Sequence, residues 1–298
     1  MSLSKNPLLL FTDLVNQHSE MYNHHGPESK KQSYFDTRLV RNSLIPVLIA
    51  SVLLAYLLII LFPVDKKALL IDIIKPTSAA IATAFSLVVV YRQKTDGIIG
   101  KAFTLLAAGL TLFLIGELIS SYNDIALGIE NSLPSIAYVF WTIAYGPIFY
   151  FVFKMYYFLG ASHSKTHQIL ICIVGVVFLT YFITLTSQNA EFSTQRGIAL
   201  FLISIAYPIL DVVFIVPSAL ILLNPVKGSL TSIPWIFLAV LILGIGDSIY
   251  AYTFNVRATE DLNWISKLFL ITSYVIAAGG LFWHNKFFIC NQKETKFF

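Results

Sequence analysis

Residues 102–121, "AFTLLAAGLTLFLIGELISS", form an apolar run whose only charged residue is Glu117. The run is longer than the roughly 18 residues that distinguish a membrane-spanning helix from a buried helix of a soluble domain. A second run, residues 235–254, "WIFLAVLILGIGDSIYAYTF", contains Asp247 as its only charged residue. The two stretches therefore predict two membrane helices, each of which places one carboxylic acid inside the bilayer.

The rest of the chain has the same character, with 57% hydrophobic and 12% charged residues over 298 positions. Soluble domains carry roughly a quarter charged residues, so water is not the solvent for most of this chain. We expect an all-α, polytopic membrane helical bundle in contact with the lipid bilayer. Eight spans are predicted, at residues 43–62, 69–91, 100–121, 133–157, 167–186, 198–223, 233–254 and 264–284.

The polar segments flank one membrane domain, residues 43–286. Residues 1–42 are expected to form a cytoplasmic N-terminal segment, part amphipathic and part flexible, and residues 287–298 a short cytoplasmic tail. Most Lys and Arg residues fall in segments on the same side as the N-terminus. Positive-inside bias therefore predicts a cell-membrane protein with both termini in the cytoplasm. The formal net charge of +4 belongs to these connections, so no nucleic-acid partner is expected.

An internal repeat relates the spans at 100–121 and 133–157 to those at 233–254 and 264–284. The plan implied is a 3+1+3 parallel internal repeat preceded by one extra span. Small residues at matching positions also predict close helix contacts. The repeat pairs Gly109 with Ala239, Gly116 with Gly246, Glu117 with Asp247 and Tyr145 with Tyr274.

Three acids lie within predicted spans, Glu117, Asp211 and Asp247. A charge at mid-depth costs at least about 2.5 kcal/mol, so these acids should face the bundle interior or a water-filled cavity. One interpretation is structural, with the acids protonated or hydrogen-bonded across helices to Tyr145, Tyr207 or Tyr274. The other is a ligand, ion or proton site in a shared outward-opening pocket. The predicted ligand-binding residues are Glu117, Asp211, Asp247, Tyr145, Tyr207, Tyr274 and Trp141.

Further polar residues extend this candidate site. Ser120 and Asp124 share a helical face with Glu117 and continue a polar stripe toward the outer end of that span. Lys75 lies three residues after Asp72 near the outer start of another span. Lys75 is expected to pair with Asp72 or to neutralise one of the buried acids.

Several chemistries find no support in the sequence. The motifs GxGxxG, GxxxxGK[ST] and GxSxG are missing, so no nucleotide-dependent or hydrolytic enzyme is predicted. The two cysteines have no CxxC spacing, and the six histidines lie in the tail, in loops or at span ends. No metal and no cofactor are therefore expected.

Residues from about 70 to 286 resemble the multi-span membrane sensory region that precedes GGDEF-type diguanylate cyclases and related bacterial signalling domains. The resemblance is carried by "GLTLFLIGELISSY", "LPSIAYVFWTIAY", "IAYPILDVVF" and "LAVLILGIGDSIYAY". Tyr207, Pro208 and Asp211 match one family motif, and Asp247 matches the acid of the next span, whereas Tyr138 replaces an acid of the family pattern. The resemblance implies a sensory core without an output domain, and hence a cytoplasmic signalling partner.

Two functions follow from these observations as hypotheses. The first is an integral membrane sensory protein whose outward-facing pocket, lined by acids and tyrosines, binds a small polar or cationic ligand. The alternative is a small-solute or ion transporter built on parallel three-helix repeats, with the same acids serving a substrate or a coupling proton. An intramembrane enzyme ranks third.

Overall fold

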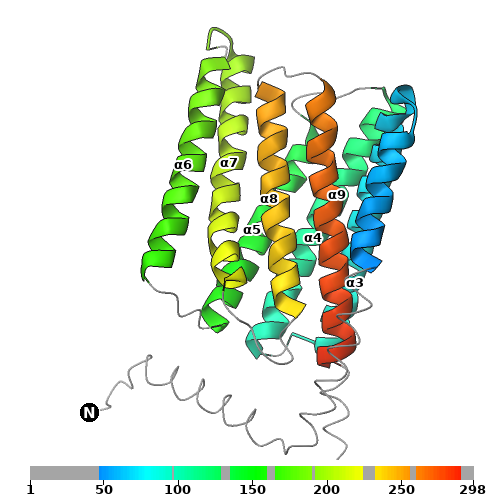
Figure 1. The fold of residues 1–298 in the computed structure, drawn as a ribbon, viewed down its shortest axis with the longest axis vertical. Coiled ribbons are helices and arrows are strands. Elements are labelled where there is room, and N and C mark those ends of the chain that lie inside the picture. The colour runs from blue at the N-terminus through cyan, green and yellow to red at the C-terminus, as the bar shows by residue number, and fades with distance from the viewer. Residues whose placement is uncertain are drawn as a thin grey trace, which may run out of the picture. The chain divides into compact units, whose positions relative to one another are not determined.

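A computed structural model describes residues 47–95, 97–128, 135–159, 165–189, 192–223, 232–255 and 260–289. Within these ranges the chain is helical and contains no strand (Figure 1). The predicted N-terminal segment 1–42 and residues 290–298 of the predicted tail lie outside the described residues. The helices are Val47–Leu61, α3 (Val64–Gln93), α4 (Gly97–Ala126), α5 (Ile136–Phe158), α6 (Lys165–Asn189), α7 (Gln195–Leu222), α8 (Ile233–Asn255) and α9 (Glu260–Trp283), followed by the π-helical η2 (His284–Ile289).

Seven of the described helices, α3 to α9, are long and apolar enough to cross a membrane. The helix Val47–Leu61 is apolar but shorter, and residues 43–46 of its predicted span lie outside the described residues. These helices confirm the predicted multi-pass helical bundle. The apolar runs form helices because only a helix satisfies all its backbone hydrogen bonds internally when no water is present.

Six of the helices pack as a ring. Helices α3, α4 and α5 pack in chain order, and so do α7, α8 and α9. Contacts between α3 and α9, and between α5 and α7, join the two groups, which we call the first and second triplet (Figure 1). Helix α6 packs outside the ring against α7 and α8. The helix Val47–Leu61 packs through Ile59 onto Ile71, Leu268 and Ile271 of α3 and α9.

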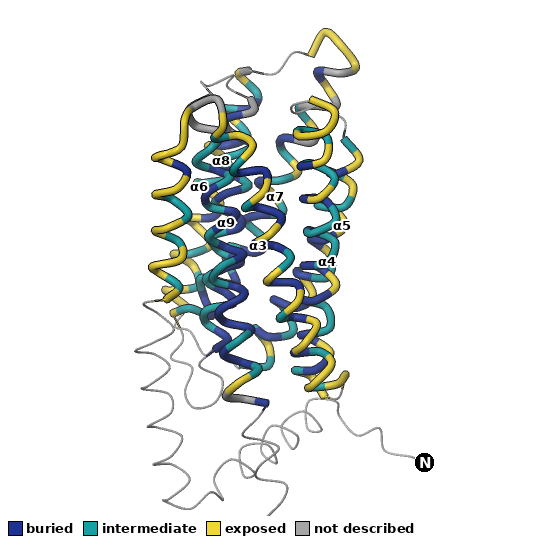
Figure 2. The backbone as a smooth tube through the Cα atoms, turned by 90° about the vertical axis from the view of Figure 1, so that its right-hand side faces the viewer, coloured by how far each residue is buried: buried dark blue, intermediate teal, exposed yellow. Residues whose placement is uncertain are grey.

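Buried and exposed residues alternate along the helices, as expected where one face of each helix points inward (Figure 2). The exposed residues of α6 include Ile173, Val174 and Val177, each with more than half of its surface accessible. Such a surface would be unstable in water and suits contact with lipid chains.

Close approach of neighbouring helices depends on small residues, as the sequence predicts. A Cβ atom at Gly116 of α4 would lie 2.5 Å from Cδ1 and Nε1 of Trp141 on α5. Gly109 similarly meets Ile148 of α5, and a Cβ at Gly246 of α8 would lie 2.9 Å from Phe269 Cβ on α9. Both glycine-mediated contacts of α4 therefore position α5, and Gly246 lets α9 approach α8.

Candidate functional site

A pocket of about 50 Å³ lies at the end of the ring where α4 and α8 end and α5 and α9 begin, which we call the pocket end. Its volume has room for a few water molecules or one small solute. All six ring helices contribute to its wall. The lining residues are Lys75, Phe113, Glu117, Ser120, Asp124, Tyr138, Trp141, Tyr207, Asp247, Tyr250, Lys267, Leu270 and Tyr274.

The structure brings the predicted site residues together. Glu117, Asp247, Trp141, Tyr207 and Tyr274 line the pocket, together with Ser120 and Asp124 of the predicted polar stripe. The two remaining predicted residues, Tyr145 and Asp211, lie behind this wall and join it through a hydrogen bond to Asp247. Three further lining residues, Tyr138, Tyr250 and Lys267, were not among the predicted ligand-binding residues.

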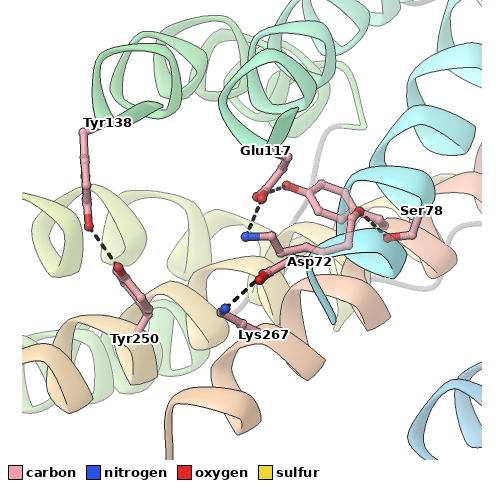
Figure 3. Close-up of polar contacts among 8 residues, drawn as sticks. Asp72, Ser78, Glu117, Tyr138, Tyr250 and Lys267 are labelled. Atoms are coloured by element: carbon pink, nitrogen blue, oxygen red, sulfur yellow. Dashed lines mark hydrogen bonds and ion pairs between the residues drawn. The ribbon is translucent and has the colours of Figure 1, made fainter. Parts of the chain in front are cut away.

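Glu117 is the centre of a buried ionic contact. Its Oε2 atom lies 2.7 Å from the Lys75 ammonium nitrogen, and its Oε1 atom accepts a hydrogen bond of 3.1 Å from the Tyr274 hydroxyl (Figure 3). Lys75, Glu117 and Tyr274 are each less than 5% exposed. Of the two expectations for Lys75, the neutralisation of a buried acid is confirmed. The contact joins α3, α4 and α9.

Asp72 pairs with Lys267 of α9 and not with Lys75 of its own helix. Its Oδ1 atom accepts a hydrogen bond of 3.1 Å from the Lys267 ammonium group on α9 (Figure 3). The side chain of Lys267 is 17% exposed, compared with 5% for Lys75, so this ion pair is the more accessible of the two. Salt screens an accessible pair more strongly than a buried one.

Tyr145 connects the two acids of the second triplet. Its hydroxyl oxygen lies 2.8 Å from Asp211 Oδ1 and 2.7 Å from Asp247 Oδ2. Ser248 donates a further hydrogen bond of 2.9 Å to Asp211 Oδ2. Asp211 is completely buried, and these bonds satisfy both of its oxygens. The predicted hydrogen bonding of acids to Tyr145 and Tyr274 is confirmed.

Aromatic side chains form another part of the wall. The Tyr138 and Tyr250 hydroxyls are 2.9 Å apart and join α5 to α8 (Figure 3). Tyr138 also packs edge-to-face on Trp141 at 5.2 Å between ring centroids. The hydrogen bond of Tyr207 goes to Thr142, at 3.4 Å, and not to an acid as one interpretation of the sequence expected.

Carboxyl groups outnumber amino groups in this region. Among the described residues, the pocket wall and the groups hydrogen-bonded behind it contain the carboxyl groups of Asp72, Glu117, Asp211 and Asp247 and the amino groups of Lys75 and Lys267. Lys75 and Lys267 pair with Glu117 and Asp72, so Asp211 and Asp247 remain without an ammonium group among their described hydrogen-bond partners. A positively charged solute would compensate this excess.

The opposite end of the ring contains a separate polar contact. His284 is completely buried, with Nδ1 3.1 Å from Ser232 Oγ and Nε2 3.2 Å from Gln93 Oε1. Its ring stacks on Phe103 at 4.2 Å between centroids. His284 lies at the end of a span, as the sequence predicts. Its burial was not predicted. Among the described residues, no group of three or more His, Cys, Asp or Glu side chains is placed to hold a metal ion.

Comparisons of this chain with protein-family models, with curated proteins and with solved structures find no match. The chemistry of the pocket is thus the basis for assigning a function.

Proposed function

We propose that this protein is an integral membrane sensory protein that binds a small cationic solute in the pocket. The observation that carries the proposal is that all six ring helices contribute polar or aromatic side chains to one small cavity. An occupant that contacts every helix of the ring changes the relative free energies of alternative ring packings. A binding event at the pocket end can thereby alter the opposite end of the bundle.

The surplus of carboxyl groups supports a cation as the ligand. Tyr138, Trp141, Tyr207 and Tyr250 present aromatic surface around the same space, and aromatic faces attract cations electrostatically. Placement of the pocket end outside the cell follows from the distribution of Lys and Arg along the sequence. The resemblance to sensory regions of bacterial signalling proteins supports a cytoplasmic partner that receives the signal.

Thermal unfolding of the purified full-length protein tests ligand binding. We expect small organic cations to raise the midpoint saturably, whereas neutral solutes of the same size leave it unchanged. Asp247→Asn should abolish the effect because Asp247 is the acid of the second triplet that lines the pocket, whereas the carboxyl group that remains, Asp211, lies behind the wall. Thr180→Val, an exposed position on α6, should retain it. Failure of every cation tested to stabilise the wild type would contradict the proposal.

Hydrogen exchange tests sensing separately from binding. A stabilising cation should change the exchange rates of amides around His284 and η2, at the end of the ring opposite the pocket. A change confined to the pocket end would argue that binding is not communicated, and that outcome would reject a sensory role.

A transporter is the second candidate, and hydrogen bonds between the triplets favour it. Tyr145 of the first triplet bonds Asp247 of the second, whereas Tyr274 of the second bonds Glu117 of the first. We infer from this reciprocal pairing a parallel repeat of the two triplets, with α6 and the helix Val47–Leu61 outside it. In transporters with such repeats, substrate binds at the interface between the repeats.

Flux measurements decide between the two candidates. Proteoliposomes that contain the wild type should not accumulate the stabilising cation if the protein is a sensor. Accumulation that disappears in Asp247→Asn and persists in Thr180→Val would establish transport instead.

A further inference from the structure

Lys75 places an ammonium group inside a pocket that we propose to bind cations. Its nitrogen lies 2.7 Å from Glu117 Oε2 and 5.8 Å from the centroid of the Trp141 ring. A carboxylate and an aromatic face around one ammonium group is the arrangement by which proteins recognise amine ligands. The chain thus contains an amine-recognition geometry that one of its own side chains occupies.

The carboxylate and the indole are held in place by contacts that do not involve Lys75. Glu117 accepts a hydrogen bond from Tyr274 through its other oxygen. Trp141 packs against the backbone of α4 at Gly116, where any side chain would collide with the indole. Both groups would therefore keep their positions if the ammonium group moved away.

Lys75 has other acids within its range. Asp72 lies three residues earlier on α3, a spacing that places two side chains on the same helix face. Asp124 lines the same pocket. A lysine side chain is long and flexible and presents its charge as a compact point, so it can change partners without losing all ionic contact. Displacement of Lys75 from Glu117 would not leave its charge uncompensated.

We propose that Glu117 and Trp141 form an ammonium-binding subsite, which Lys75 fills in this structure and from which a small alkylammonium ligand displaces it. The proposal rests on the proposed function and specifies its ligand class. It also makes Lys75 an internal competitor, so the ligand must exchange with a tethered amine before it reaches Glu117.

The variant Lys75→Ala and propylammonium chloride together provide the test. Alanine lacks the three terminal carbons and the nitrogen of lysine, and propylammonium supplies the same atoms as a free molecule. We expect Lys75→Ala to lower the thermal midpoint of the full-length protein and propylammonium to raise it saturably. Propanol and sodium chloride at equal concentration should not do so.

Two variants control for nonspecific effects of the amine. The double variant Lys75→Ala/Glu117→Gln lacks the carboxylate and should not respond to propylammonium. Lys154→Ala removes a lysine whose ammonium group lies 5.1 Å from the Tyr150 ring centroid, outside the pocket, and should respond to propylammonium no more than the wild type does. Equal rescue by propanol, or equal rescue of the double variant, would overturn the subsite.

The wild type gives a second measurement should Lys75→Ala fail to fold. Propylammonium that enters the subsite should change the tryptophan emission of the wild type, and Trp141→Phe should lose this change. No amine-dependent change in the wild type would overturn the proposal. Amine binding without altered hydrogen exchange at the opposite end would reject the sensory function and leave the subsite standing.

Discussion

At the residue scale, the Tyr145 hydroxyl makes two short contacts with carboxyl groups. It lies within 2.8 Å of oxygens of both Asp211 and Asp247, yet a hydroxyl group carries one hydrogen. Only one carboxyl oxygen can accept that hydrogen, so the second short contact requires a proton on a carboxyl group. The neighbouring hydroxyl donors Ser248 and Tyr274 bond other oxygens, since Ser248 donates to Asp211 Oδ2 and Tyr274 donates to Glu117.

The hydrogen count predicts that Asp211 and Asp247 share one proton at neutral pH. Infrared spectra of the purified protein should contain the C=O stretch of a protonated carboxyl group, shifted by exchange into D₂O. Asp211→Asn and Asp247→Asn should each remove the band, because one remaining carboxylate can accept directly from Tyr145. Glu117→Gln should retain it, because Glu117 faces an ammonium group. A band that survives in both Asp variants would refute the shared proton.

At the element scale, the contact of α4 with α5 depends on the missing side chain of Gly116. In Gly116→Ala the new methyl group would lie 2.5 Å from the Trp141 indole, which must then move from its position in the pocket wall. Overpacking of this kind costs about 1–3 kcal/mol. We expect that loss in the free energy of unfolding, measured by detergent-denaturant titration, together with weaker binding of any cation that contacts Trp141.

Gly146 of α5 provides the matched control, because a Cβ there would meet no atom of another helix within 4 Å. Gly146→Ala should lower the free energy of unfolding less than Gly116→Ala, since its only new close contact is with Pro147 of the same helix. If the two variants have the same free energy of unfolding, the close contact at Gly116 does not determine the packing of α4 and α5.

The elements also show how far the sequence predicts this site. Apolar length predicts the helices, and the cost of a charge in lipid predicts that Glu117 and Asp247 point inward. The partners depend on how each helix is rotated against the others, which short-range patterns do not determine. The partner of Lys75 was therefore left open between Asp72 and the buried acids, and Tyr207 was expected to hydrogen-bond an acid, although it bonds Thr142. Lys267 was missed because its partner, Asp72, lies on a helix far away in the sequence.

At the scale of the whole molecule, the distribution of positive charge predicts the orientation in the membrane. The connection between α3 and α4 is flanked by Arg92, Lys94 and Lys101, whereas residues 127–135, between α4 and α5 at the pocket end, contain no Lys or Arg. Cytoplasmic loops are enriched in these residues. The pocket should therefore open to the outside of the cell, where a sensory protein would meet an external solute.

Cysteine labelling in intact cells tests this orientation. The background is Cys172→Ser/Cys290→Ser, and single cysteines replace Thr95, in the connection between α3 and α4, or Leu127, just after α4, both exposed. A membrane-impermeant maleimide should label Leu127→Cys in intact cells and Thr95→Cys only after permeabilisation, because the two positions lie at opposite ends of α4. The reverse pattern would place the pocket in the cytoplasm, and with it the source of the ligand. In that case the pocket carboxyl groups would bind intracellular cations, and the ligand would be a cytoplasmic amine.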